Sequence, residues 1–153
     1  MSEEIFSELV LESRSALALD KGRMKTIITG VPGGLQAIGP YSLGVIAGGR
    51  LIFVSGMTPF NPATGKIERG SISAQTVLVL ENIKTVLGAG GASLSDVVSC
   101  RVYLSSLTPE TFKEMNEVYA GYFGGSPPAR ATVGAQLLGF DVEIECVAAL
   151  PEP

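Results

Sequence analysis

The segment SPPARATVGA, residues 126–135, places one arginine behind two prolines at the start of a strand-like run. The planar guanidinium of Arg130 carries a fork of donors that can bind a carboxylate at two points. The rigid Pro127-Pro128 approach reduces the entropy lost in holding that fork in place. A surface ion pair is the competing interpretation, because that is the usual role of a lone arginine at a strand start. Arg130 is therefore a candidate carboxylate-binding residue.

Two carboxylates share one face of the last strand-like run, DVEIECVAAL. Side chains alternate along a strand, so Glu143 and Glu145 point away from the core. The intervening positions form an apolar core face, made of Val142, Ile144, Cys146 and Ala148. One glutamate can orient a water molecule if it lies in a cleft, and a solvated or ion-paired sheet face is the alternative.

The chain contains no histidine, which restricts its acid–base chemistry. Nucleophile pairs of the Ser-His-Asp and Cys-His types, and the usual zinc sites, all need imidazole. Cys100 and Cys146 lie in apolar, strand-like runs far apart in the sequence, so we expect two reduced core residues. Proton transfer must then fall to carboxylate, tyrosine, lysine or water.

Two hydroxyl residues also follow suggestive segments. Tyr41 stands behind Gly-Pro in IGPYSLG, and Ser55 ends the strand-like run LIFVS, although each residue alone is weak evidence. The glycines of GAGG, residues 88–91, follow a helical pattern, whereas a phosphate-binding loop follows a strand. We interpret them as a helix C-cap and a turn, so the sequence predicts no nucleotide site.

Hydrophobic periodicity predicts the elements that position these residues. Strand-like runs cover residues 24–29, two segments within 42–56, 96–104, 129–135 and 141–150. Gly48-Gly49 separates the two segments and predicts a hairpin. Helical spacing runs from Ser71 to about Leu87, and again from Thr108-Pro109 to about Phe123-Gly124. The expected apolar stripes of these helices are Val79, Ile83, Val86 and Leu87 in the first, and Phe112, Met115, Tyr119 and Tyr122 in the second.

The resulting order of elements, βββ-α-β-α-ββ, predicts an α+β fold in which one mixed sheet carries both helices on one face. In the strand after the first helix, Val98, Cys100, Val102 and Leu104 should face the helices, and Ser99, Arg101 and Tyr103 the other side. We expect Arg130 on the same second face as Arg101. That second face also carries Val147 and Ala149, so the face is too apolar to be exposed to water. Together with only 17% charged residues, it indicates burial between subunits.

Length and charge bound the remaining possibilities. The 153 residues suit one domain, which we place at 24–153, and residues 1–23 are an extension: a tail, a short helix, or an upstream start before Met24. Fifteen acidic against eleven basic residues give no footprint for nucleic acid or anionic membranes. No apolar run approaches the roughly 20 residues of a membrane span, and the N-terminus lacks a basic signal-peptide region. The expected location is the cytoplasm.

Several motifs in series resemble the Rid family of imine deaminases, also called YjgF-like proteins. They are IGPYSLGV, FVSGMTPFNPATGKI, the helix ETFKEMNEVYAGYF, PPARATV and VEIECVA, in that order, and the likeness covers about residues 24–150. The resemblance implies a chorismate-mutase-like fold, a homotrimer, and clefts between subunits that bind small carboxylate-bearing ligands. Members that are deaminases hydrolyse 2-aminoacrylate and related enamines or imines to 2-ketoacids and ammonia, without a cofactor.

The resemblance also implies roles for individual residues. Arg130 matches the family's carboxylate-binding arginine and Glu143 its water-orienting glutamate. Tyr41, Ser55 and Asn116 match residues that line the cleft, and Thr132 stands there where many relatives have a cysteine. Met57 replaces a common glutamine, so these two departures concern substrate range. One alternative is a non-catalytic trimer that senses a carboxylate metabolite or acts as a chaperone, and another is action on a pyrimidine-derived aminoacrylate. A third is a ribonuclease, which the acidic pI of about 4.8 disfavours.

Overall fold

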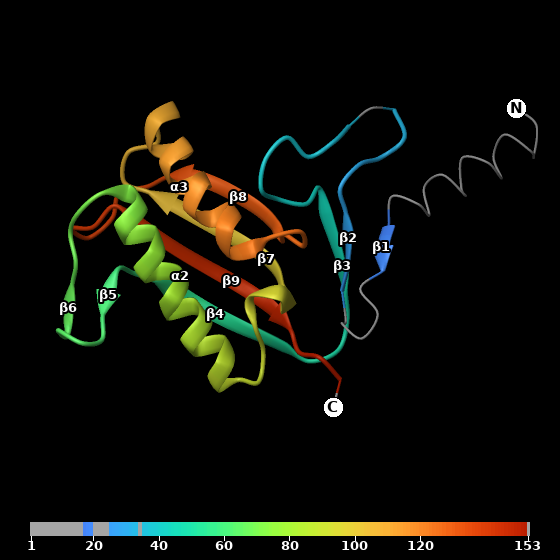
Figure 1. The fold of residues 1–153 in the computed structure, drawn as a ribbon, viewed down its shortest axis with the longest axis horizontal. Helices are drawn as coiled ribbons and strands as arrows, with labels where there is room; N and C mark the ends of the chain where they lie inside the picture. Colours follow the sequence, from blue (N-terminus) through green and yellow to red (C-terminus); the bar gives the residue numbers. More distant parts are fainter. Residues whose placement is uncertain (1–16, 20–24, 34, 153) are drawn as a thin grey trace, which may run out of the picture.

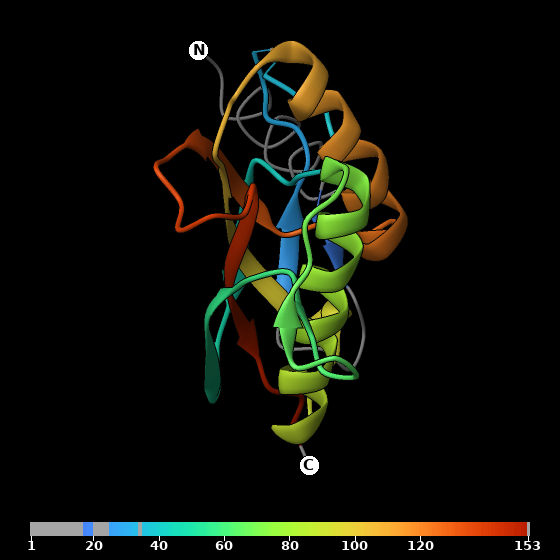
Figure 2. The same ribbon diagram turned by 90° about the vertical axis from the view of Figure 1, so that its left-hand side faces the viewer.

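The computed structural model describes residues 17–19, 25–33 and 35–152. Within these ranges the chain forms a layer of strands covered on one side by two helices, as Figures 1 and 2 show from two directions. The predicted α+β fold, with two helices on one face of a mixed sheet, is confirmed. What we expected of residues 1–16 and 20–24 lies outside the described ranges.

Four strands form the main sheet, in the order β4-β9-β7-β8. Their bounds are Leu51–Met57 for β4, Val97–Leu104 for β7, Ala129–Gly134 for β8 and Val142–Ala149 for β9. Strand β9 runs antiparallel to β4 and β7, whereas β8 runs parallel to β7. Because parallel neighbours need a crossover, the chain passes over the sheet between β7 and β8, and α3 makes this passage. Strand β8 is thus an edge strand beneath α3.

The two helices are α2 (Ile72–Ala89) and α3 (Pro109–Phe123), close to their predicted bounds. The side chains of Ser71 and Thr108 cap them by accepting hydrogen bonds from backbone N–H groups in the first turns. Gly124 ends α3 with a φ of 55°, a conformation that favours glycine. These local signals explain why both helices begin and end where the sequence predicts.

The core lies between the helices and the main sheet. The inward residues predicted for β9 are all buried, as are three of the four predicted for α2. The fourth, Val86, is 38% exposed, so that prediction was wrong. In β7 the register against β9 shifts between Val97 and Ser99, so Val97 is buried and Val98 is only partly buried. A bulge of this kind cannot be recognised from alternation alone.

The strands do not form the one sheet that we predicted, because a second, antiparallel sheet has the order β1-β2-β3. Its strands are Leu17–Leu19, Lys25–Ile28 and Gly44–Ala47. The hairpin predicted around Gly48-Gly49 was wrong, because β3 pairs with β2 while β4 pairs with β9. The turn is real, since Gly49 has a φ of 83°, but it carries the chain from one sheet to the other. A parallel bridge between Ser42 and Ala129 joins this part of the chain to β8.

Shorter elements complete the described chain: β5 (Phe60–Asn61) and β6 (Lys66–Ile67) pair with each other, and a 3₁₀ turn, η1, covers Leu94–Asp96. Among the described residues, neither helix combines the length and apolarity needed to cross a membrane. On the sheet face away from the helices, Phe53 is 74% exposed and Tyr103 and Val147 are partly buried, whereas Ala149 is already buried within the chain. That face is therefore apolar and accessible in the single chain.

Candidate active site

Arg130 lies at the start of β8, where α3 crosses the sheet edge. Its Nη1 donates a hydrogen bond of 2.6 Å to Oδ1 of Asn116 on α3. Three aromatic rings surround the guanidinium carbon: Tyr119 at 4.7 Å, Phe112 at 5.6 Å and Tyr41 at 5.7 Å from the ring centroids. The structure thus brings together three residues that the sequence proposed for the site, namely Arg130, Asn116 and Tyr41.

The helix face that meets Arg130 follows from sequence spacing. Phe112, Asn116 and Tyr119 are four and then three positions apart, so their side chains lie on one side of α3. Helical spacing predicts that Phe112 and Tyr119 belong to the core stripe of α3, and Tyr119 is fully buried. The sequence did not predict that these two rings contact the guanidinium of Arg130. Asn116, a polar residue on the same face of α3, was the one indication that this face meets a polar group.

The segment before Arg130 is fixed by hydrogen bonds from distant parts of the chain. The hydroxyl of Ser42 donates to the carbonyl of Pro127, and the backbone N–H of Ser42 donates to the carbonyl of Pro128. The buried Lys25 donates through Nζ to the carbonyl of Ser126 at 3.2 Å. Together with two prolines, these contacts leave Arg130 little backbone freedom.

The electrostatic surroundings of Arg130 are unusual for a partly buried cation. Within residues 25–33 and 35–152, no carboxylate forms an ion pair with it, so a neutral amide and aromatic faces provide its contacts. Burial lowers the pKa of the guanidinium from its ordinary value, although arginine remains charged at physiological pH. A buried charge without a counter-ion is costly, so an anion is favoured beside it.

The structure corrects our prediction that Arg130 shares the second sheet face with Arg101. In the parallel ladder Arg130 lies beside Cys100, which is buried beneath the helices, so Arg130 points to the helix side of the sheet edge. The exposed Ala131 and Val133 occupy the other face of β8. Single-strand alternation could not decide this, because the usual assumption places the apolar residues inward.

Glu143 lies on the opposite side of the sheet from Arg130. It is between the buried Val142 and Ile144 on β9, so its carboxylate projects from the face away from the helices. Within β4, Gly56 lies directly below it: an added Cβ at Gly56 would be 2.1 Å from Oε1 of Glu143. One chain therefore does not place Glu143 against Arg130.

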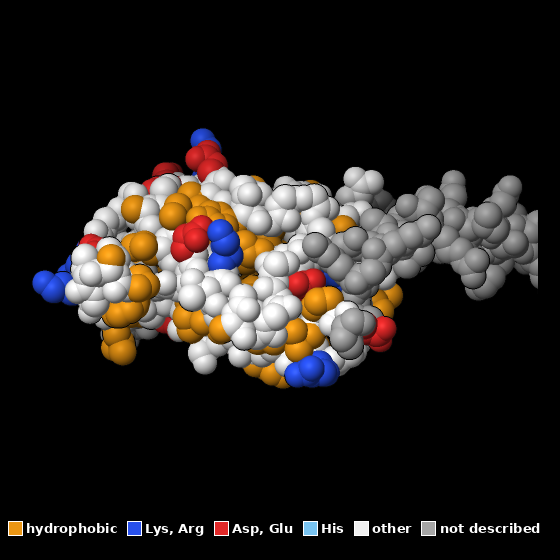
Figure 3. Space-filling model, turned by 60° about the horizontal axis from the view of Figure 1, so that its bottom comes forward, with side chains coloured by type: hydrophobic (Ala, Val, Ile, Leu, Met, Phe, Trp, Pro, Cys, Tyr) orange, Lys and Arg blue, Asp and Glu red, His pale blue; other side chains and the backbone are white. Residues whose placement is uncertain are grey.

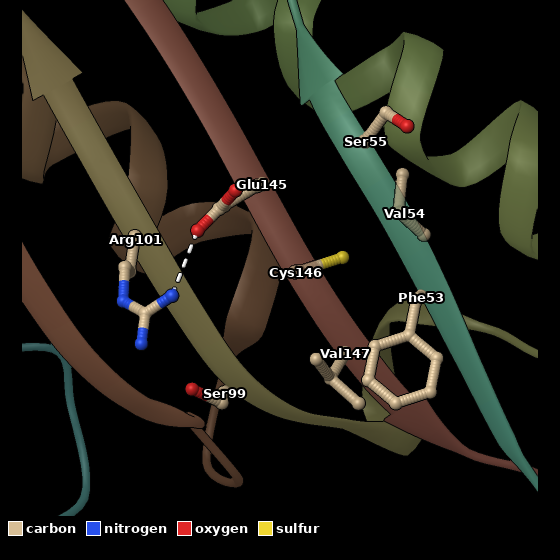
Figure 4. Close-up of a pocket in the computed structure, with 8 residues that line it drawn as sticks. All are labelled: Phe53, Val54, Ser55, Ser99, Arg101, Glu145, Cys146 and Val147. Atoms are coloured by element: carbon tan, nitrogen blue, oxygen red, sulfur yellow. Dashed lines mark hydrogen bonds and ion pairs between the residues drawn. The ribbon is translucent and has the colours of Figure 1, made fainter.

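Ser55 belongs to the same face as Glu143 and is exposed. It lines a shallow pocket of about 450 Å³ between β4, β9 and β7, together with Phe53, Ser99 and Val147 (Figure 4). Figure 4 also shows the ion pair in this pocket, in which Nη1 of Arg101 donates to Oε1 of Glu145 at 3.0 Å. Arg101 is thus paired, and it serves as a comparison for Arg130.

Thr132, two residues after Arg130, shares its side of β8. Its hydroxyl is buried and has no hydrogen-bond partner among the described residues, and the same holds for the hydroxyl of Tyr119. Burial raises the pKa of the Tyr119 hydroxyl, which stays neutral. Thr132 is therefore near the arginine in the strand but enclosed by the same chain.

The two cysteines are free and buried, as the sequence predicted. Cys100 and Cys146 are cross-strand neighbours on β7 and β9, under the helices. In the part of the chain that the structure describes, no group of three or more Cys, Asp or Glu side chains is arranged to hold a metal ion. The structure thus places the partly buried guanidinium of Arg130 on one side of the sheet and the carboxylate of Glu143 on the other.

Comparisons with known proteins agree with this fold. A family model described as endoribonuclease L-PSP matches residues 33–150. A RutC family protein of Pyrococcus horikoshii is 50% identical over 115 residues, which cover 74% of this chain and 89% of that protein. The chloroplastic Reactive Intermediate Deaminase A of Arabidopsis thaliana is 38% identical over 138 residues, covering 89% of this chain and 72% of that one.

A solved structure shows the same architecture. It is a Yersinia pestis protein, YyfB, described as a protein of unknown function of the conserved Rid protein family. It is 29% identical, the match covers 83% of this chain and 99% of the other, and the TM-score is 0.74. The similarity therefore extends over nearly all of the described core.

Proposed function

This chain belongs to the Rid family, also called YjgF-like, and from that premise we propose that it hydrolyses reactive 2-aminoacrylate-type enamines and imines to 2-ketoacids and ammonia. The observation that carries the proposal is Arg130, a partly buried cation held by a neutral amide and without a carboxylate partner in the described chain. Such a group suits a ligand that brings its own carboxylate.

The proposed site is shared between subunits of a homotrimer. Arg130 and Glu143 lie on opposite sides of the sheet, so a pocket that contains both takes one from each of two neighbouring chains. The apolar face that carries Phe53 and Val133 supports such an assembly, since it is accessible in the single chain. Tyr41 and Asn116 then accompany Arg130, and Ser55 accompanies Glu143.

The chemistry needs few protein groups. The enamine first tautomerises to a 2-iminoacid, whose protonated C=N carbon is already electrophilic, so the proposal invokes no metal or cofactor. Arg130 holds the carboxylate, and Asn116, whose Oδ1 is engaged by Arg130, keeps its Nδ2 as a donor to the substrate. Thr132 contributes to the enclosure around the arginine and bears on substrate range.

Glu143 is the proposed general base and general acid of the reaction. Its carboxylate accepts a proton from a water as the water oxygen bonds to the imine carbon, giving a tetrahedral carbinolamine. The same carboxylic acid then gives that proton to the amine, and the C–N bond breaks. As the C=O bond of the 2-ketoacid forms, the hydroxyl proton passes to the departing ammonia, which leaves as ammonium. Glu143 ends deprotonated, and one water is consumed for each ammonia released.

The test is a coupled assay in which a pyridoxal-phosphate lyase generates 2-aminoacrylate and the purified protein accelerates the release of pyruvate and ammonia. Arg130→Ala should reduce this acceleration to background while the trimer persists. Arg101→Ala removes a cation that is already paired with Glu145, so it should retain most of the activity. If Arg130→Ala forms a normal trimer and works like the parent, Arg130 is not the carboxylate-binding residue.

The main alternative is a trimer that binds carboxylate metabolites, or chaperones other proteins, without turnover. Binding of a 2-ketoacid without any acceleration of imine hydrolysis would favour it. The family description also names an endoribonuclease, but the net charge is −4, and on the side shown in Figure 3 the basic side chains are few and scattered. Incubation with RNA therefore belongs in the assay as a negative control.

We also propose a cytoplasmic location, although the Arabidopsis relative is named chloroplastic.

A further inference from the structure

Gly56 lies near the end of β4, one residue before its last residue, Met57. An added Cβ there would be 2.1 Å from Oε1, 2.9 Å from Cδ and 3.2 Å from Cγ of Glu143. The first two distances are shorter than any normal contact to a carbon atom. The side chain of Glu143 therefore occupies the space that a side chain at position 56 would need.

The backbone gives no other reason for glycine at this position. Six described glycines have a positive φ and so occupy conformations that disfavour other residues, and Gly56 is not among them. Alanine is thus allowed by the main chain. The three atoms nearest to an added Cβ all belong to the flexible side chain of Glu143.

A bulge in β4 produces this close approach. Val54 pairs with Cys146 and Met57 with Ile144, so three steps along β4 match two along β9. The extra residue falls at Ser55-Gly56, and a bulge of this kind re-aims the side chains around it. The bulge brings the backbone of Gly56 beneath the Glu143 carboxylate.

We propose that Gly56 is a positioning residue for the reaction: the missing Cβ lets the Glu143 carboxylate lie flat against β4, and this placement aims it at the substrate. This inference rests on the proposed role of Glu143. Gly56 would act by setting the position of the Glu143 carboxylate and would not itself contact the substrate. The atoms that an added Cβ would displace are at the far end of the flexible Glu143 side chain.

The consequence separates stability from catalysis. In Gly56→Ala the carboxylate must move by about 1 Å to restore a normal contact, and a 1 Å misplacement of a reacting group can cost about 10²-fold in rate. Because only a flexible side chain has to shift, folding and assembly should persist. We expect kcat to fall by about 10- to 100-fold, with KM for the carboxylate substrate nearly unchanged.

The experiment combines Gly56→Ala with Glu143→Asp. Aspartate is one methylene shorter and has no atom at the position of Oε1, so the 2.1 Å contact with the new methyl group is lost. Gly56→Ala should therefore lower kcat strongly in the parent and less in the Glu143→Asp background. Gly88→Ala is the matched control, because an added Cβ at Gly88 meets nothing within 4 Å. It should leave kcat unchanged.

A crystal structure of Gly56→Ala gives a readout that does not depend on activity. A displaced Glu143 carboxylate with lowered kcat supports the proposal. An undisplaced carboxylate, a displaced one with the parental kcat, or equal losses in both backgrounds overturns it. If the parent itself does not hydrolyse imines, the proposed function fails, and the crystal structure still decides whether Gly56 sets the position of Glu143.

Discussion

The substitution Asn116→Asp tests whether the charge of Arg130 must be left available to a ligand. It replaces the amide by a group of almost the same shape, but places a carboxylate oxygen where Oδ1 now accepts from Nη1 at 2.6 Å. The guanidinium would then be neutralised by its own chain. A substrate carboxylate would have to compete with this internal partner, so binding should weaken although no contact is sterically blocked.

The magnitude follows from the hydrogen bond that the substrate would lose. A charge-assisted bond contributes roughly 1.5–3 kcal/mol, and about 1.4 kcal/mol corresponds to a tenfold change in affinity. Binding of a 2-ketoacid should therefore weaken by about 10- to 150-fold, measured by calorimetry, and KM for the imine should rise similarly. The same ion pair should raise the melting temperature, because it compensates a partly buried charge.

Two controls isolate the effect. Ala120→Asp adds the same charge at an exposed position of α3 and should change 2-ketoacid affinity only slightly, since exposed charges are well screened. Asn116→Ala removes the acceptor without adding charge, so it should weaken binding less than Asn116→Asp. If Asn116→Asp binds 2-ketoacids as tightly as the parent, the reasoning is refuted, and Arg130 does not receive the ligand's carboxylate.

Three further predictions concern the site, the extension and metals. Glu143→Gln keeps the shape but removes the proton acceptor, so hydrolysis should fall by about 10²–10⁴-fold with assembly unchanged; parental rates would make the carboxylate structural. The full chain should sediment as a trimer. Deletion of residues 1–23 removes β1, but it should preserve both trimer and activity because β2 retains its pairing with β3; loss of assembly would make the extension structural. Activity should survive exhaustive chelation, and metal-dependent recovery after inactivation would contradict the mechanism.

Local signals in the sequence predicted the parts of this fold that depend on neighbouring residues. Thr108-Pro109 marks the start of α3 because a hydroxyl cap and a proline suit a helix N-terminus wherever it occurs. Alternation likewise identified the buried face of β9, where both neighbours are strands of one sheet. The pairing of β3 with β2 could not be found in this way, because two adjacent strands with a Gly-Gly turn carry the pattern of a hairpin whichever partners they choose.

The candidate residues were found more readily than their arrangement. Arg130, Asn116 and Tyr41 meet because α3 crosses the sheet edge at β8 and because Ser42, next to Tyr41, bridges to Ala129. These are long-range contacts that no single segment encodes. The aromatic surroundings supplied by Phe112 and Tyr119 were hidden because apolar residues on a helix are expected in the core. Gly56 was not predicted, because the proposed role depends on its lack of a side chain. That lack matters only because the Glu143 carboxylate lies next to it, which the sequence does not show.

The placement of Arg130 and Glu143 on opposite sides of the sheet has a genetic consequence. Two alleles that are each inactive, one lacking the arginine and the other the glutamate, should complement each other when expressed together. A site whose arginine side comes from the Glu143→Gln chain and whose glutamate side comes from the Arg130→Ala chain is intact, and random mixing makes about one quarter of the sites so. Co-expression should therefore restore about a quarter of parental activity, which a site confined to one chain could not do.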